Sequence, residues 1–236
     1  MSGWKARRFW TRATVAEVVG GFSVRLDDRP VRTPAKAPLV VPTAAMAQAI
    51  ASEWQAQEKT VDPATMPVTR AANAAVDKVG PQRAEVAGML AAYADADLTC
   101  YRAATPAALV ERQASAWDPL LDWAARRYGA RLIPVEGVVH AAQPRRSLER
   151  LAVPVHRMTA FELTGFHDLV CLSGSLIIAL AATNRLFPLS DLWQRSRIDE
   201  IWQEEQWGVD EDAAAAAASK RRAFLDGYAF YAMSEE

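Results

Sequence analysis

The stretch LVCLSGSLIIALAA, residues Leu169 to Ala182, places fourteen apolar or small residues in one run. A helix that spans a membrane needs about twenty such residues, so this run is too short. An apolar run of this length is typical of a helix buried in a protein core. We therefore predict a buried core helix, within a helical segment of about residues 160–184, and no membrane insertion.

Helical periodicity continues on both sides of this run. Thr43 can cap a helix whose Met46, Ile50 and Trp54 are spaced four apart and share one stripe. Pro119 lies inside another predicted helix and should bend it or split it in two. The remaining predicted helices cover about residues 67–79 (ending at Gly80-Pro81), 81–93, 106–128 (ending at Gly129), 147–157, 188–207 and 210–233.

The first forty residues follow a different pattern. The segment TVAEVVGGFSVRLDDRPVRTP alternates β-forming residues around two turn signals, and PLVVPT adds a short strand bounded by prolines. A hairpin alone is marginally stable, so it should pack on helices or recruit a later strand; ARLIPVEGVVHAAQP, residues 130–144, is a candidate strand or hairpin. The predicted class is α+β, with a small β-rich domain at 1–42 packed on a larger, mainly α-helical domain at 43–236.

Composition excludes several classes of function. The net charge of -1 provides no overall field to attract nucleic acid or an anionic membrane.

Cys100 and Cys171 lack metal-ligand spacing, and we expect free structural thiols in a reducing compartment. The basic start MSGWKARRFWTR resembles a weak mitochondrial presequence but leads directly into strand-like sequence. We expect it to belong to the mature domain of a bacterial cytoplasmic protein, or of a mitochondrial matrix protein if the source is eukaryotic.

Motifs for catalysis are absent from the sequence. It contains no phosphate-binding glycine loop, no G-x-S-x-G turn and no H-E-x-x-H. His140, His156 and His167 also miss the E-x-x-H spacing of carboxylate-bridged metal sites. We predict no catalytic residue, no metal and no cofactor, and expect each histidine to be structural or exposed.

The segment SRIDEIWQEEQWG, residues Ser196 to Gly208, is the best candidate for a functional surface. Helical spacing puts Ile198, Ile201 and Trp202 on a core side and leaves a broad polar side. That polar side allows three interpretations: a solvated face with an Arg197–Glu200 pair, a catalytic carboxylate pair, or a surface that recognises a protein. The predicted polar side carries Asp199, Glu200, Gln203, Glu204 and Trp207.

Several segments, in this order, resemble one protein family. The family is that of the chaperones that assemble the F(1) sector of ATP synthase by binding its alpha subunit. The resemblance covers about residues 9 to 208, although Val68 and Ala71 replace bulkier leucines that are common in the family. The segments are RPVRTPAKAPLVVPT, AIASEWQAQ, MPVTRAANAAVD, DLTCYRA, LVERQASAWDPLLDW, LSGSLIIALA and SRIDEIWQEEQWG.

The resemblance implies a chaperone without catalytic activity. Such a protein holds the unassembled alpha subunit and prevents its aggregation until a beta subunit replaces the chaperone. We expect a monomer whose acidic segment binds alpha, with an enzyme using Glu200 and Glu204, or a general adaptor, as the alternatives. Other residues in family motifs are expected to be structural, with Trp54 in the core and Arg102 paired to an aspartate: Glu53, Trp54, Arg70, Asp97, Tyr101, Arg102, Trp117 and Asp118.

Overall fold

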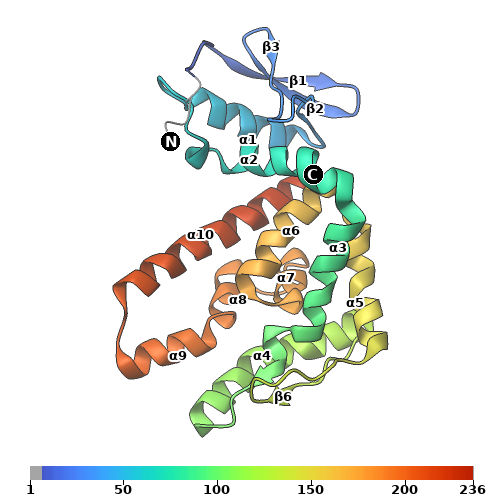
Figure 1. Cartoon of the computed structure of the whole chain (residues 1–236), viewed down its shortest axis with the longest axis vertical. Helices are drawn as coiled ribbons and strands as arrows, with labels where there is room; N and C mark the ends of the chain where they lie inside the picture. The colour runs from blue at the N-terminus through green and yellow to red at the C-terminus, as the bar shows by residue number, and fades with distance from the viewer. Residues whose placement is uncertain (1–6, 236) are drawn as a thin grey trace. The chain divides into compact units, whose positions relative to one another are not determined.

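The computed structural model describes residues 7–235, and their packing divides the chain into two compact units (Figure 1). Among the described residues, the first unit holds 7–83, 159–165 and 229–235, and the second holds 84–158 and 166–228. The predicted α+β class is confirmed, with a small N-terminal sheet and a larger helical part. The start of the predicted basic segment, residues 1–6, lies outside the described residues.

The first unit is a small antiparallel sheet covered by helices. Residues Val18 and Gly21 close the first hairpin, and β2 pairs with three other strands, as the alternating sequence predicted. The elements of this unit are β1 (Ala13–Val18), β2 (Gly21–Leu26), β3 (Arg29–Pro30), β4 (Val40–Val41), α1 (Ala44–Gln55), a short 3-10 turn (Pro63–Thr65) and α2 (Pro67–Ala74), followed by a π-helical turn (Ala75–Val79) and a 3-10 turn (Gly80–Gln82).

Helix α1 lies against this sheet and closes its core. The Thr43 hydroxyl accepts from the Met46 N–H, which confirms the predicted cap, and Met46 and Ile50 are buried in one cluster with Val24 and Leu39. Burial of these apolar side chains couples the helix to the strands. The predicted domain boundary after residue 42 therefore differs from the observed units, because α1 and α2 belong with the sheet.

The second unit is a helical assembly with one two-stranded sheet. Helix α6 begins in the first unit and continues in the second, and α10 runs in the opposite sense from the second to the first. The elements are α3 (Arg83–Ala91), 3-10 turns (Ala92–Ala96 and Leu98–Cys100), β5 (Tyr101–Arg102), α4 (Ala107–Tyr128), β6 (Val135–Glu136), α5 (Arg145–Arg157), α6 (Ala160–Ser173), α7 (Leu176–Thr183), α8 (Leu189–Arg195), α9 (Ile198–Trp207) and α10 (Glu211–Ser234).

Two predicted long helices are each broken in the structure. The segment at 160–184 divides at Gly174, whose φ of 69° is left-handed, and Ser175 then caps α7 through the Ile178 N–H. The segment at 188–207 divides at Ser196, whose hydroxyl bonds back to the Trp193 carbonyl. Serine side chains compete for backbone bonds in this way, and periodicity alone does not reveal it.

Other details also differ from expectation. Helix α4 continues through Pro119 without splitting, because Pro119 and Ser115 face solvent, where water can satisfy the carbonyl that loses its donor. Helical turns also continue through Gly80-Pro81. The predicted strand near residue 135 does not form a hairpin: β6 pairs in parallel with β5.

The apolar run at 169–182 is the buried core that its composition predicted. The whole of α7 from Leu176 to Ala182 is buried, together with Leu169 and Val170 of α6. Within residues 7–235, no helix is long and apolar enough to cross a membrane.

Trp54 tests whether the early helix contributes stability or a contact surface. Its ring packs edge-on against Trp10 at 5.2 Å between centroids, beside the first unit's core. Trp54→Arg should remove this contact, place a charge against apolar side chains and lower the free energy of unfolding by about 3 kcal/mol. Thermal denaturation of the purified variant measures this loss. Trp207→Arg is the matched control, because Trp207 is 79% exposed and should leave the melting temperature unchanged; equal melting of both variants would contradict the assignment.

Candidate functional site

Helix α9 is fixed on α4 by polar contacts. The Gln113 amide donates to the Asp199 carboxylate at 2.6 Å, and Arg112 forms a salt bridge with Glu205 at 2.8 Å. The Arg112 guanidinium also lies over the Trp202 ring, 5.0 Å from its centroid. Asp199, Trp202 and Glu205 therefore form the side of α9 that faces α4, at helical spacing.

This orientation corrects part of the predicted division of α9. Ile198 is buried and Ile201 and Trp202 are half-buried, as a core side requires. Asp199, however, is half-buried and hydrogen-bonded to Gln113, so it lies on the α4 side and not on the free polar side. Trp193, which the predicted helix at 188–207 included, belongs to the separate helix α8 and is buried.

The outward side of α9 carries four of the predicted residues, and we call these the α9 surface: Glu200, Gln203, Glu204 and Trp207. The predicted Arg197–Glu200 pair is confirmed at 2.7 Å. Gln203 is exposed, Glu204 is half-buried, and the Trp207 indole is 79% exposed at the helix end. A large exposed indole beside carboxylates is suited to contact with another macromolecule.

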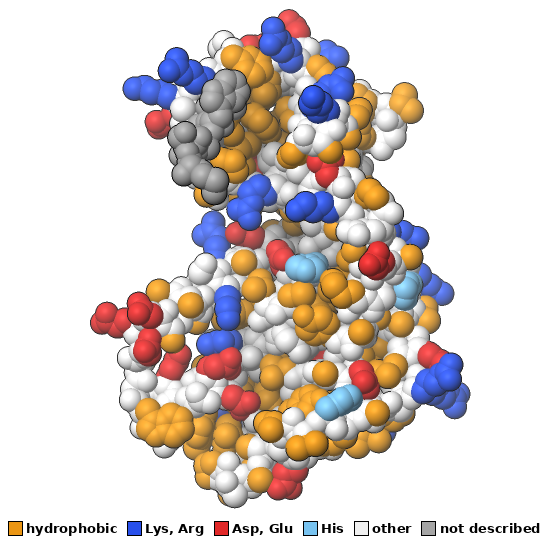
Figure 2. Space-filling view, in the orientation of Figure 1, with side chains coloured by type: hydrophobic (Ala, Val, Ile, Leu, Met, Phe, Trp, Pro, Cys, Tyr) orange, Lys and Arg blue, Asp and Glu red, His pale blue; other side chains and the backbone are white. Residues whose placement is uncertain are grey.

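The charge around the α9 surface has one sign. From Asp199 to Ser219 the chain carries seven carboxylates and neither lysine nor arginine, although its total charge is only -1. Figure 2 shows acidic side chains gathered over α9 and the start of α10. Asp210, Glu211 and Asp212 are exposed there. This concentration of negative charge favours a basic partner surface.

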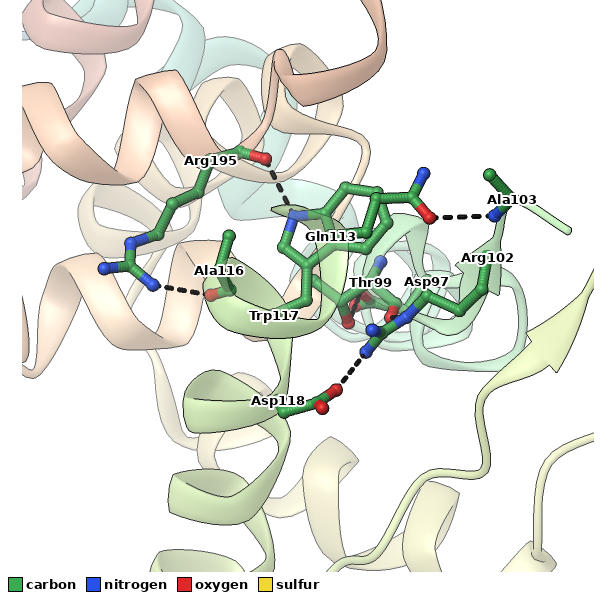
Figure 3. Close-up of polar contacts among 9 residues, drawn as sticks. All are labelled: Asp97, Thr99, Arg102, Ala103, Gln113, Ala116, Trp117, Asp118 and Arg195. Carbon is green, nitrogen blue, oxygen red and sulfur yellow. Dashed lines mark hydrogen bonds and ion pairs between the residues drawn. The ribbon is translucent and has the colours of Figure 1, made fainter. Parts of the chain in front are cut away.

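Beneath α9, a polar cluster holds α4, α8 and β5 together (Figure 3). Arg102 pairs with Asp118 at 2.7 Å and lies over Trp117, 5.3 Å from the ring centroid. The fully buried Trp117 indole N–H donates to the Arg195 carbonyl at 2.8 Å, and Arg195 donates in return to the Ala116 carbonyl. The aspartate that was expected to pair with Arg102 is therefore Asp118.

Asp97 is completely buried, and neutral donors surround its carboxylate. Oδ1 accepts from the Thr99 N–H and from the Thr99 and Ser175 hydroxyls, and Oδ2 accepts from the Ile177 N–H at 3.0 Å. Burial raises the pKa of Asp97, and these hydrogen bonds act in the opposite direction. The carboxylate thus joins the turn at 97–99 to the first turn of α7.

The other residues in family motifs occupy local structural positions. Glu53 accepts from the Val68 and Thr69 N–H groups and so caps the start of α2. Tyr101 is half-buried in β5, and Arg70 is exposed on α2.

Metal-ligand geometry is not found within residues 7–235: no group of three or more histidine, cysteine, aspartate or glutamate side chains is placed to hold a metal ion. Glu200 is paired with Arg197, and the groups around Asp97 are sealed from solvent.

Comparison with known proteins identifies the family. The sequence profile of the ATP12 chaperone protein family matches residues 7–125. The chain belongs to the ATP12 chaperone family. Members of the ATP12 family are chaperones of ATP synthase assembly.

Solved structures agree with this assignment. The ATP12 protein of Paracoccus denitrificans is 47% identical over 98% of this chain and 99% of its own, with a TM-score of 0.95. An aspartate-to-lysine mutant of Atp12p from P. denitrificans has the same identity and TM-score, and covers 99% of this chain and 100% of its own. A protein from Agrobacterium tumefaciens is 40% identical over 98% of this chain and 86% of its own, with a TM-score of 0.91.

Two residues that hold α9 in place, Gln113 and Arg112, are not predicted from the sequence. Gln113 is only 2% exposed, and its side-chain oxygen also accepts from the Ala103 N–H at 2.8 Å. It occupies the apolar stripe that includes Leu109 and Trp117, and a polar residue in such a stripe indicates a buried hydrogen-bonding partner. Arg112 follows no comparable pattern, because its partners Trp202 and Glu205 are distant in sequence.

Replacement of Asp97 tests whether its buried hydrogen bonds stabilise the fold. Asp97→Asn leaves one side-chain oxygen and one amide N–H₂ group. The N–H₂ group then faces either the Ile177 N–H or the Thr99 and Ser175 donors, in place of an acceptor. One buried donor then lacks an acceptor, and the free energy of unfolding should fall by about 2 kcal/mol. Denaturant titration measures the fall. Asp118→Asn, at a carboxylate that is 56% exposed, should cost under about 1 kcal/mol; a smaller effect at Asp97 than at Asp118 would refute this account.

Proposed function

We propose that this protein binds the unassembled alpha subunit of the F(1) sector of ATP synthase and prevents its aggregation until the alpha subunit pairs with beta. The binding site in this proposal is the α9 surface. The observation that carries it is Trp207. Its indole is 79% exposed at the end of α9, on the helix that also carries Glu200 and Glu204. Tryptophan is enriched among the residues that dominate binding energy at protein interfaces, and an exposed indole offers a large apolar area that a partner can bury.

The charges suit reversible capture. An unassembled subunit exposes a surface that is later covered by its neighbour, and a chaperone must protect that surface without holding it permanently. Carboxylates such as Glu200 and Glu204 accelerate encounter with a basic surface and add contacts that salt weakens. An exposed tryptophan surrounded by negative charge thus allows the chaperone to bind a basic surface selectively and still to release it.

Asp199 has a positioning role in this proposal. Its hydrogen bond to Gln113, together with the Arg112–Glu205 bridge, fixes α9 against α4 before any partner arrives. A surface that is already ordered loses less conformational entropy on binding. Its negative charge adds to the field of the α9 surface, although Oδ1 is occupied by Gln113.

The remaining parts of the proposal follow from a role in subunit capture. The protein acts by binding and not by catalysis, as a monomer, in the compartment where F(1) is assembled. That compartment is the cytoplasm of a bacterium, or the mitochondrial matrix if the source is eukaryotic. Glu200 is paired with Arg197, and no group of three or more possible metal ligands occurs within residues 7–235, so neither observation supports the alternative of an enzyme based on Glu200 and Glu204.

Charge reversal on α9 tests the surface. Glu200→Lys with Glu204→Lys breaks the Arg197–Glu200 pair and should lower the melting temperature only slightly, because that pair is partly exposed, but it should abolish protection of the alpha subunit. Light scattering of isolated alpha subunit at constant ionic strength measures the protection. Glu85→Lys with Glu149→Lys, at exposed positions of α3 and α5, changes the charge by the same amount away from α9 and should protect normally. A folded α9 double variant that protects like the wild type would exclude α9 as the binding surface.

Two substitutions at Asp199 separate its charge from its position. Asp199→Asn keeps an oxygen for Gln113, so it should weaken protection only modestly. Because one negative charge is lost, protection by this variant should also fall less steeply as the salt concentration rises. Asp199→Lys removes that acceptor and should lower both protection and the melting temperature, because Gln113 is left buried without its partner. Equal protection by the two variants would show that positioning by Asp199 is unimportant.

Affinity capture tests the partner. The tagged protein should retain the alpha subunit as the main protein from a lysate of its source that is depleted in beta, and purified beta should release it. The Glu200→Lys/Glu204→Lys variant should retain less alpha subunit than the wild type if α9 is the surface that binds it. Retention of beta or of many unrelated proteins would favour a general adaptor instead.

A further inference from the structure

A cluster of ionisable side chains lies in the second unit, away from α9. Helix α6 presents His167 and Cys171 four residues apart, so they share one face of the helix, and Asp168 lies next to His167. The His167 Nδ1 is 3.0 Å from the Asp168 carboxylate. From the turn Ala92–Ala96, the Tyr93 hydroxyl approaches the Cys171 sulfur to 3.6 Å. Cys171 itself is exposed.

The surroundings of Cys171 favour its thiolate. A hydrogen bond from His167 lowers the pKa of the Cys171 thiol, a second from Tyr93 adds to this, and partial burial and the charge of Asp168 oppose them. Asp168 and Cys171 in turn raise the pKa of His167 to about 10, which favours the protonated ring. The imidazolium and the thiolate thus stabilise one another, and Asp168 orients the ring.

Cys100 has the opposite environment. Its side chain is 1% exposed, and desolvation, with the nearby charge of Asp97, raises the pKa of the thiol to about 12. A buried neutral thiol does not react at a useful rate. The chain therefore contains its own comparison between an exposed cysteine beside His167 and a buried cysteine at which desolvation outweighs the opposing charge of Arg102.

We propose that Cys171 is a site of reversible S-thiolation, at which its sulfur exchanges with a small-molecule disulfide such as oxidised glutathione. This inference is independent of the proposed capture of the alpha subunit. It rests on the exposure of Cys171, on the Tyr93 hydroxyl 3.6 Å from its sulfur, and on His167 one helical turn before it on the same face of α6. A free thiol in a surface position with a cationic neighbour is the kind that such disulfides modify.

The chemistry is a two-electron exchange. The Cys171 thiolate attacks one sulfur of the disulfide along the S–S axis, so a new bond forms from Sγ to that sulfur while the original S–S bond breaks. The electron pair of the broken bond leaves with the second sulfur as a glutathione thiolate, which takes a proton from water. The protein thiol is oxidised and one glutathione is reduced. An external thiol reverses the step, since buried Cys100 is not available in the folded chain.

Mass spectrometry of the full chain tests the proposal. The folded protein is incubated with oxidised glutathione over a range of pH, and digested peptides report the mixed disulfide at each cysteine. Modification should be confined to Cys171, be reversed by dithiothreitol, and reach half its maximal rate at a lower pH than modification of N-acetylcysteine amide, a reference thiol without a neighbouring charge. Equal modification of Cys100, or a pH profile like that of N-acetylcysteine amide, would overturn the proposal.

Variants separate the role of His167 from a general effect on folding. His167→Gln should react severalfold more slowly at neutral pH, with its rate profile displaced to higher pH, whereas Cys171→Ser should form no adduct. Tyr93→Phe should give a smaller displacement in the same direction. Melting temperatures identify any variant that is unfolded, and the wild-type profile decides the question if one is. A folded His167→Gln protein with the wild-type rate and profile would refute the assigned arrangement.

Discussion

The second unit depends on one buried carboxylate that has no cation beside it. Asp97 lies fully within the apolar interior and is held by the donors of Thr99, Ser175 and Ile177. Removing a charge from water is expensive unless every lone pair is used, so these donors must stay in place while Asp97 is ionised. This requirement fixes the turn before β5 against the start of α7. Helix α7, which is buried from Leu176 to Ala182, then places the neighbouring helices around it.

Ordered polar contacts extend from this centre toward the surface. Arg102 lies between Asp118 and the face of Trp117, and the Trp117 indole holds the Arg195 carbonyl at the end of α8. Gln113, one turn before Trp117, reaches Asp199 of α9. Each buried polar group has a specific partner, so this set of contacts permits one arrangement of α4, α8 and α9. The exposed acids and Trp207 are thereby presented from a fixed support.

The two cysteines illustrate how local surroundings divide one residue type into two chemical roles. Cys100 is enclosed next to Asp97, where burial and negative charge both disfavour its thiolate. Cys171 faces solvent beside the imidazolium of His167. The sequence shows two cysteines without metal spacing and predicts structural thiols for both. Only the packing of the turn at 92–96 against α6 reveals that Tyr93 reaches Cys171.

The sequence by itself determined the α+β class, the two N-terminal turns, the Thr43 cap, the buried run at 169–182 and the family, because hydrophobic period, capping chemistry and ordered motifs act over short distances in the chain. It also determined the pairing of Arg197 with Glu200, which are three residues apart. Only the tertiary structure decided where the helices break and which side of α9 faces α4. Those outcomes depend on Ser175 with Asp97 and on Asp199 with Gln113, pairs 78 and 86 residues apart, which no local period can connect.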